Sequence, residues 1–420
     1  MTTTETTVFE TLESNVRGYC RSWPTVFATA RGARLTDEDG KEYLDFFAGA
    51  GALNYGHNNP VLKRALIDYL VGDGLTHGLD MSTVAKRALL ETMGELVFEP
   101  RGLDYKVQFP GPTGANAVEA ALKLARKVTG RTTVLNFTNA FHGMSLGALS
   151  VTGNAAKRAG AGVPLVHAMP MPYDGYFGVA DDLVWMRRAL DDSSSGVDRP
   201  AAVIVETVQG EGGVNVARAE WLRQLATLCA DRGILLIVDD VQMGCGRTGP
   251  FFSFEVAGIT PDIVTLSKSI GGYGLPMALV LMKRELDQWT PGEHNGTFRG
   301  NNAAFVTAEA ALRHYWSDDR LVAATLAKGE RVRASLTALV DHFGGMSTRG
   351  RGLVHGLVFD DASQAAKVAR VAFELGLLVE TSGSDDEVVK LLPPLTITDD
   401  ELTLGLDLLA QAVDSVRHGH

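Results

Sequence analysis

Two polar side chains lie near the ends of apolar segments. Asp239 comes directly after one such segment, and Lys268 lies close to the end of another. The segments 234–238 and 263–266 are rich in β-branched residues, which is typical of buried strands in a parallel sheet. In α/β proteins such strands deliver side chains to their carboxyl ends, where ligands bind. Lys268 follows Asp239 by twenty-nine residues. We therefore expect the carboxylate and the amine to face one ligand.

A carboxylate and a lysine placed in this way suit pyridoxal phosphate (PLP). The lysine forms a Schiff base with the cofactor, and the carboxylate pairs with the protonated ring nitrogen so that the ring accepts electrons. Taken singly, such a lysine is more often a solvated strand end, and such an aspartate is more often a loop cap. The pair together, with Gln242 and the turn at 246–249 nearby, favours the cofactor site.

The composition is that of an ordinary globular protein. The 420 residues are long enough for two domains, and the net charge of −11 argues against nucleic acid as a partner. Three scattered cysteines are too few for a disulfide framework or a zinc site. We expect no metal and a reducing cytoplasm. The first residues carry no leader signal, and the longest uncharged apolar stretch, 269–282, is too short to span a membrane.

Strands and helices are expected to alternate from about residue 55 to 305, which implies an α/β domain with a largely parallel sheet covered on both faces. The expected strands are 107–109, 133–137, 202–205, 234–238, 263–266 and 279–282, and the expected helices include 115–128 and 218–232. Residues 1–54 are expected to add a short helix and a hairpin near Gly40. Residues 306–420 are expected to form a small α+β domain with four helices, at 304–315, 321–339, 363–375 and 399–416.

Three further segments carry a resemblance to a known family. The segments 45–57, 108–126 and 141–153, together with the surroundings of Asp239 and Lys268, resemble the class III (ω-) aminotransferases over nearly the whole chain. The resemblance implies PLP fold type I, with a mostly parallel seven-stranded sheet between helices in a large domain (55–305). A small α+β domain (306–420) would be joined by the N-terminal segment (1–54).

Within this family, the chain is most similar to the branch that transfers an amino group from L-glutamate to L-aspartate 4-semialdehyde. The products are L-2,4-diaminobutyrate and 2-oxoglutarate, and in that branch the diaminobutyrate leads to ectoine, a compatible solute. The same reaction also serves secondary metabolism, and the sequence leaves that choice open. The net charge and the lack of a membrane segment fit an enzyme that acts on small substrates.

The resemblance also implies which residues hold PLP. The phosphate is expected at the start of the predicted helix, where free N–H groups favour an anion, although an ordinary helix cap at Thr113 is the alternative. Asp239 is expected at the ring nitrogen, and strand alternation places its rival Asp240 on the opposite side. The expected cofactor residues are Thr113, Gly114, Ala115, Phe141, His142, Glu206, Asp239, Val241, Gln242 and Lys268, with Phe141 and Val241 on the two ring faces and Gln242 at the phenolic oxygen.

A further residue, Thr297, matches a segment that reaches the phosphate of a neighbouring subunit in the family. It implies a homodimer or larger assembly with a shared active site.

The residues expected to bind substrate depart from the family pattern. Glu211 matches an acid that pairs with a C-terminal arginine and changes partner between the two substrates, but Lys390 stands at the arginine's place. Met144 stands where ornithine and 4-aminobutyrate aminotransferases carry another arginine. Because both arginines are absent, we expect glutamate to be held through Lys390, Arg21 or Arg299. This departure favours the diaminobutyrate branch.

Three alternatives remain open from the sequence. The nearest is another ω-aminotransferase, for ornithine, 4-aminobutyrate or lysine-type amines. The second is a different PLP reaction, such as that of an aminomutase or a decarboxylase. The third is a non-catalytic homologue, which need not keep Lys268, Asp239 and Gln242.

Overall fold

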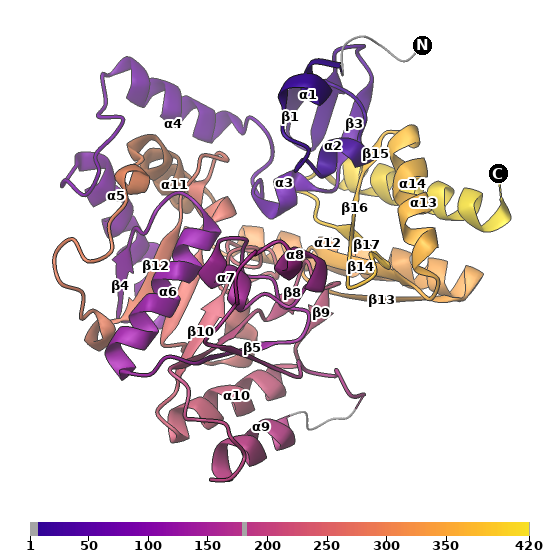
Figure 1. The fold of residues 1–420 in the computed structure, drawn as a ribbon. Coiled ribbons are helices and arrows are strands. Elements are labelled where there is room, and N and C mark those ends of the chain that lie inside the picture. Colours follow the sequence, from indigo (N-terminus) through magenta and orange to yellow (C-terminus); the bar gives the residue numbers. More distant parts are fainter. Residues whose placement is uncertain (1–6, 179–182, 420) are drawn as a thin grey trace.

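The computed structural model describes residues 7–178 and 183–419 (Figure 1). Residues 1–6, where no leader is expected, lie outside the described residues, as do 179–182 and 420. A seven-stranded sheet occupies the centre, in the order β4-β12-β11-β10-β7-β5-β6. Only β12 runs opposite to the other six strands, so the expected mostly parallel sheet is confirmed. Its strands are β4 (Tyr105–Gln108), β5 (Val134–Phe137), β6 (Ala168–Met171), β7 (Ala202–Val205), β10 (Leu235–Asp239), β11 (Ile263–Leu266) and β12 (Leu279–Lys283).

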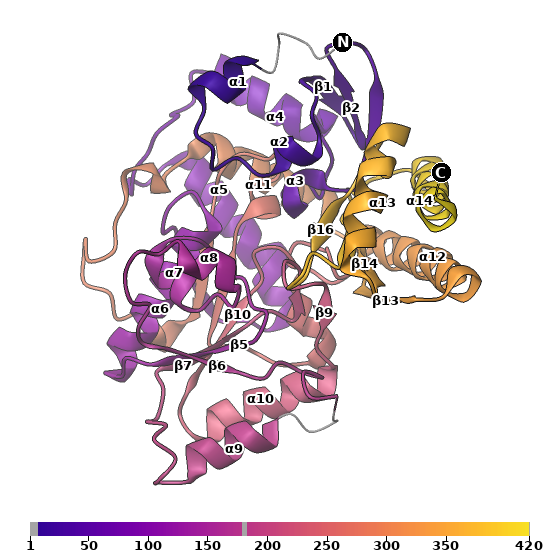
Figure 2. The same cartoon turned by 45° about the vertical axis from the view of Figure 1, so that its right-hand side comes forward.

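Helices cover both faces of this sheet (Figure 2). Alternate residues of β10 explain why: Ile237 packs in a cluster with the apolar side of α6 (Gly114–Thr129), whereas Leu236 and Val238 pack in the larger core with α10 (Ala219–Asp231). Side chains on a strand alternate between faces, so an unbroken apolar segment is required where both faces are buried. The remaining helices of this region are α4 (Pro60–Val71), α5 (Val84–Met93), α7 (Leu146–Ser150), α8 (Ala155–Ala159), α9 (Leu183–Asp191) and α11 (Asn302–Tyr315).

The two ends of the chain meet in a second sheet. The predicted hairpin is present, and its strand β3 pairs in parallel with β15, far along the chain (Figure 1). This sheet contains β1 (Phe27–Arg31), β2 (Arg34–Asp37), β3 (Glu42–Asp45) and β15 (Leu377–Leu378). In the sequence, the short helices α1 (Thr7–Leu12) and α2 (Tyr19–Ser22) precede β1, and α3 (Ala48–Gly51) follows β3. The N-terminal segment therefore contacts the C-terminal part, as expected, while the exact domain boundaries stay a prediction.

The C-terminal part has its own antiparallel sheet, in the order β13-β14-β17-β16. Its elements are α12 (Arg320–Phe343), β13 (Met346–Arg351), β14 (Val354–Phe359), α13 (Ala362–Leu375), β16 (Glu380–Ser382), β17 (Val388–Leu391) and α14 (Asp399–His418). The small hairpin of β8 (Val208–Gln209) and β9 (Asn215–Val216) contacts this part of the chain where β9 meets β13. The predicted helices of this region are confirmed, with α12 a few residues longer at its C-terminus than expected.

A buried arginine joins the N-terminal, central and C-terminal parts of the chain. Arg247 is fully buried, and its Nη1 donates to the backbone oxygens of Leu353 (2.9 Å) and Pro393 (2.6 Å), while its Nη2 donates to Asn54 Oδ1 (2.7 Å). Burial lowers the pKa of this guanidinium to about 9. These bonds hold the turn at 246–249, which follows β10, against both the N-terminal and the C-terminal part of the chain.

Among the described helices, none has the length and apolar character needed to cross a membrane.

Candidate active site

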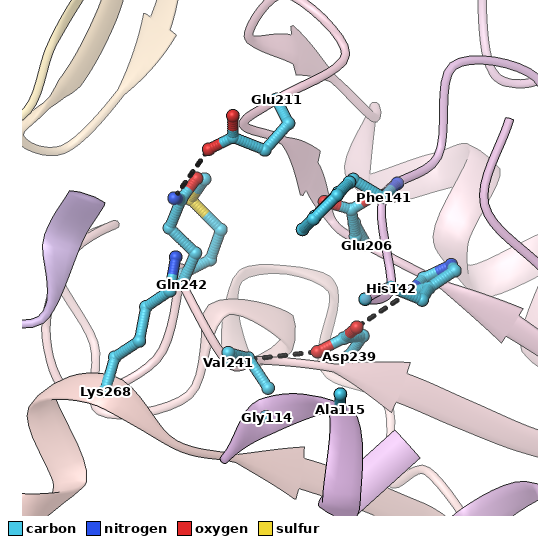
Figure 3. A pocket seen from close by; sticks show the side chains of 12 residues that line it. Gly114, Ala115, Phe141, His142, Glu206, Glu211, Asp239, Val241, Gln242 and Lys268 are labelled. Atoms are coloured by element: carbon cyan, nitrogen blue, oxygen red, sulfur yellow. Dashed lines mark hydrogen bonds and ion pairs between the residues drawn. The ribbon is translucent and has the colours of Figure 1, made fainter. Parts of the chain in front are cut away.

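A cavity of about 210 Å³ lies at the carboxyl end of β10, beside the start of α6 (Figure 3). It is lined by Gly114, Ala115, Phe141, His142, Gly143, Glu206, Glu211, Asp239, Val241, Gln242, Met243 and Lys268. Parallel strands end at one edge of a sheet, so residues far apart in sequence meet there. The structure thus brings nine of the eleven expected cofactor residues, all but Thr113 and Thr297, into one cavity together with Glu211.

Asp239 is the last residue of β10, and its carboxylate contacts three polar groups. His142 Nδ1 lies 2.7 Å from its Oδ2, Thr265 Oγ1 donates to its Oδ1 (2.9 Å), and the Val241 N–H donates to the same oxygen (3.2 Å). These contacts fix the carboxylate while leaving it on the cavity wall. A buried carboxylate with this support is able to hold a cationic ring nitrogen.

Burial and the neighbouring charges shift the pKa values of Glu206 and His142, which lie beside Asp239. Burial raises the pKa of Glu206 to about 8, and Asp239 adds to the effect, whereas His142 opposes it. One oxygen of Glu206 accepts the N–H of Phe141 (2.9 Å). For His142, burial alone would lower the pKa, but the bond to Asp239 outweighs it and the pKa is raised. These shifts favour the protonated form of both Glu206 and His142, the two groups that flank Asp239.

Asp240 faces away from the cavity, as strand alternation predicts. Its carboxylate accepts from the Ser253 N–H (2.9 Å) and from the Ser253 hydroxyl, on the other side of β10. Burial raises its pKa to about 7. Asp239 therefore lines the cavity and Asp240 does not, while the contact of Asp239 with the ring nitrogen stays a prediction.

Lys268 lies on the opposite side of the cavity from Asp239 (Figure 3). Its Nζ donates to the backbone oxygen of Ala50 (2.8 Å), which also accepts from Gln242 Nε2 (3.0 Å). Lys268 has φ 53° and Ala50 has φ 56°, a left-handed region that non-glycine residues rarely adopt and that clusters at functional sites. Burial lowers the pKa of the Lys268 amine, although Glu211 opposes the shift. A lowered pKa increases the fraction of free, nucleophilic amine.

The pairing of Glu211 with Lys390 is present, and a second acid joins it. Lys390 Nζ lies 2.8 Å from Glu211 Oε1 and 3.0 Å from Glu380 Oε1, and its side chain is completely buried. Gln242 Nε2 also donates to Glu211 (3.1 Å). Burial alone would raise the pKa of Glu211, but Lys390 and Lys268 lower it to about 2. The sequence reasoning missed Glu380, which lies directly opposite Lys390 in the pair β16–β17.

The start of α6 approaches the cavity closely. A methyl group on Gly114 would lie 2.8 Å from Val241 Cγ1, so only glycine allows this approach. Thr113 caps the helix through a capping box with Asn116. Thr113 does not line the cavity, so its side chain fits the alternative of an ordinary cap, while the N–H groups behind it remain suited to an anion.

The cavity has the chemistry that PLP requires. Phe141 and Val241 lie across it from each other, Asp239 and Lys268 lie at two ends, and the helix start with Gly114 provides the anion-binding end (Figure 3). Each feature matches one part of the cofactor: the flat ring, the ring nitrogen, the aldehyde and the phosphate.

Other expected residues lie outside this cavity. Arg21 bonds to the backbone oxygens of Arg17 (3.1 Å) and Asn15 (3.3 Å), and Arg299 lines a separate surface hollow. Thr297 is exposed on a short helical turn. Met144 is 53% exposed. Within the described single chain, none of these four lines the cavity, so their roles stay predictions.

Comparison with known proteins identifies the family. The model of the class III aminotransferases matches residues 19–413. This chain belongs to the class III aminotransferases. Proteins named diaminobutyrate--2-oxoglutarate transaminase are similar over their full length. The one from Nocardia farcinica is 79% identical over 100% of this chain and 96% of its own, and the one from Streptomyces anulatus is 68% identical over 97% of each.

Solved structures share the fold of this aminotransferase. An ornithine aminotransferase from Toxoplasma gondii, described with PLP at its active site, has a TM-score of 0.84 and 27% identity, covering 99% of this chain and 94% of its own. An S-selective transaminase from Arthrobacter has a TM-score of 0.87 at 24% identity, covering 98% of each chain. The fold is therefore PLP fold type I, and PLP is the cofactor.

Proposed function

We propose that this aminotransferase moves the amino group of L-glutamate to the aldehyde carbon of L-aspartate 4-semialdehyde, giving L-2,4-diaminobutyrate and 2-oxoglutarate. The observation that carries the proposal is full-length identity of 56–79% to proteins named for this reaction. The joint placement of Asp239 and Lys268 in one cavity supports the chemistry.

The residues of the cavity have distinct proposed roles. Lys268 would hold PLP through its Nζ, and its amine, when free, would accept the proton from the carbon that bears the amino group. Its lowered pKa keeps that amine free to accept a proton. Asp239 holds the proton on the ring nitrogen, with His142 fixing its orientation. Bound PLP supplies an electron sink for the carbon that loses its proton.

The remaining cavity residues orient the cofactor. Gln242 lies beside Lys268 and would donate to the phenolic oxygen, and Phe141 and Val241 would hold the ring between them. The N–H groups at Gly114 and Ala115 bind the phosphate, as free amides at a helix start favour an anion. Glu206 supports the ring site from behind Phe141.

We also propose assembly as a homodimer or larger, with Thr297 reaching the neighbour's phosphate. Phe298 beside it is 68% exposed and so is accessible to a neighbouring subunit. A cytoplasmic location and a place in ectoine synthesis follow from the resemblance and stay predictions.

The direct test offers several amines to the PLP-loaded protein with 2-oxoglutarate and quantifies the glutamate formed. Diaminobutyrate should be strongly preferred over ornithine, 4-aminobutyrate and lysine. Preference for one of the other amines would keep the family and the cofactor but overturn the proposed substrate. Failure to form glutamate from any of them would count against 2-oxoglutarate as the acceptor.

A further inference from the structure

The proposed substrates have a carboxylate in common that the cavity must accommodate. In glutamate, the distal carboxylate carbon lies three bonds from the carbon that bears the reacting amine. In diaminobutyrate, which reacts at its 4-amino group, the carboxylate carbon also lies three bonds from the reacting carbon. One cation beside the cavity is therefore able to bind both substrates in turn. This reasoning rests on the proposed function.

The cations already described are poorly placed for this task. Lys268 is committed to the cofactor. Lys390 has no exposed side-chain surface and already contacts two carboxylates, so binding a third anion requires breaking a buried ion pair, which is costly. Arg21 and Arg299 do not line the cavity.

A second cavity, of about 220 Å³, adjoins the first, and Phe141 and Glu211 line both. Lys157, on α8, lines this second cavity, and its Nζ lies 4.5 Å from the centre of the Phe141 ring. Within residues 7–178 and 183–419, no carboxylate lies at ion-pair distance from Lys157. Asn139 and Asn154, which also line the cavity, add polar side chains beside it.

The nearby acid does not cancel this positive charge. Glu211 is ionised, with a pKa of about 2, but its carboxylate is already bonded to Lys390 (2.8 Å) and Gln242 (3.1 Å). The Lys157 ammonium lies over the Phe141 ring, whose negative face favours the cation. A substrate carboxylate that passes the edge of Phe141 would enter the reach of the Lys157 amine.

We propose that Lys157 binds the carboxylate three bonds from the reacting carbon, in both glutamate and diaminobutyrate, and so disfavours amines whose carboxylate lies farther from the reacting carbon. Phe141 then separates the cofactor ring on one side from the carboxylate-binding lysine on the other. Ornithine, whose carboxylate lies one bond farther from its reacting carbon, fits this spacing less well.

The test compares Lys157→Met with Lys367→Met, which removes the same charge from an exposed site on α13. Each PLP-loaded protein is mixed with one amine donor alone, and the change in cofactor absorbance is followed over a range of donor concentrations. The donors are glutamate, diaminobutyrate and 1,3-diaminopropane, which is diaminobutyrate without its carboxylate.

Lys157→Met should raise the half-saturating concentration of glutamate and diaminobutyrate about 10- to 100-fold, the range for a lost hydrogen bond to a charged group. The value for 1,3-diaminopropane should change less than about twofold, and Lys157→Arg should restore most of the loss. Lys367→Met should match the unaltered protein. Equal weakening of all three donors, or of none, would overturn the proposal.

A binding measurement separates this proposal from the proposed function. Glutarate, a dicarboxylate without an amine, is titrated into the loaded proteins by calorimetry, and Lys157→Met should bind it about 10-fold or more weakly. If the unaltered protein reacts with glutamate but rejects diaminobutyrate, the proposed substrate is wrong, while glutamate and glutarate still decide the role of Lys157. Unchanged glutarate binding in Lys157→Met would contradict that role.

Discussion

Removing Lys390 should destabilise the folded protein strongly, because two buried acids would lose their shared cation. Lys390 lies 2.8 Å from Glu211 and 3.0 Å from Glu380, and all three side chains are largely or completely buried. Breaking a buried ion pair by removing one partner costs about 3–5 kcal/mol, because the remaining charge is left without compensation. We therefore expect Lys390→Met to lose about 3–5 kcal/mol of unfolding free energy at pH 8.

The loss should shrink at lower pH. Glu211 has its pKa lowered from 4.5 to about 2, so its contribution to stability is fully present above pH 4.5 and is lost as the pH falls towards 2. For Lys390, burial lowers the pKa but both acids outweigh it and raise it above 10.5, so its contribution is present up to that pH. Without the lysine, burial raises the pKa of both carboxyls. They then take up protons on the way from pH 8 to pH 5, which removes part of the penalty.

Urea unfolding of the cofactor-free protein, followed by tryptophan fluorescence at pH 8 and pH 5, measures these differences. Lys367→Met serves as the control for loss of one lysine. A triple variant, Lys390→Met with Glu211→Gln and Glu380→Gln, should recover most of the stability, because neutral groups of similar shape leave no buried charge. The reasoning is refuted if Lys390→Met is as stable as the unaltered protein at pH 8, or if the triple variant is no more stable than the single one.

Two further predictions concern the wall around Asp239. Asp239→Asn should lower kcat about 100- to 1000-fold, as expected when a pre-placed charge is removed from a catalytic site; near-normal kcat with normal PLP content would rule out the role at the ring nitrogen. Glu206→Gln should raise the thermal midpoint of the cofactor-free protein more at pH 9 than at pH 5.5. The reason is that Glu206 has its pKa raised from 4.5 to about 8, so stability is present below pH 4.5 and is lost as the pH rises to 8. A difference in thermal midpoint between Glu206→Gln and the unaltered protein that does not depend on pH would contradict this prediction.

Much of the large sheet could be predicted because its strands are buried on both faces. The strands β7 and β11 match the expected segments to the residue, since unbroken β-branched segments between polar turns are a strong signal. The edge strand β6 was not predicted. Its sequence Ala168–Met171 contains a proline and is half-buried, so it has neither the apolar segment nor the alternation of a typical strand.

The residues of the site also divide into those with a local sequence signal and those without one. Asp239 and Lys268 could be found because each lies at or near a strand end, where function is expected. Glu380 could not be recognised from local pattern, because its partner Lys390 lies across a hairpin and only strand pairing brings them together. A search for opposite charges at equal distances from the turn between two short strands would have found it. Lys157 lies on a helix of only five residues, whose sequence carries no pattern that indicates a ligand.

The most direct test of the account is to find where PLP is attached. The loaded protein is reduced with borohydride, digested and analysed by mass spectrometry, which locates the cofactor on a single lysine. We predict that the peptide containing Lys268 carries the pyridoxyl group. Attachment at another lysine, such as Lys390 or Lys157, or no attachment in protein whose PLP content is confirmed, would contradict the account.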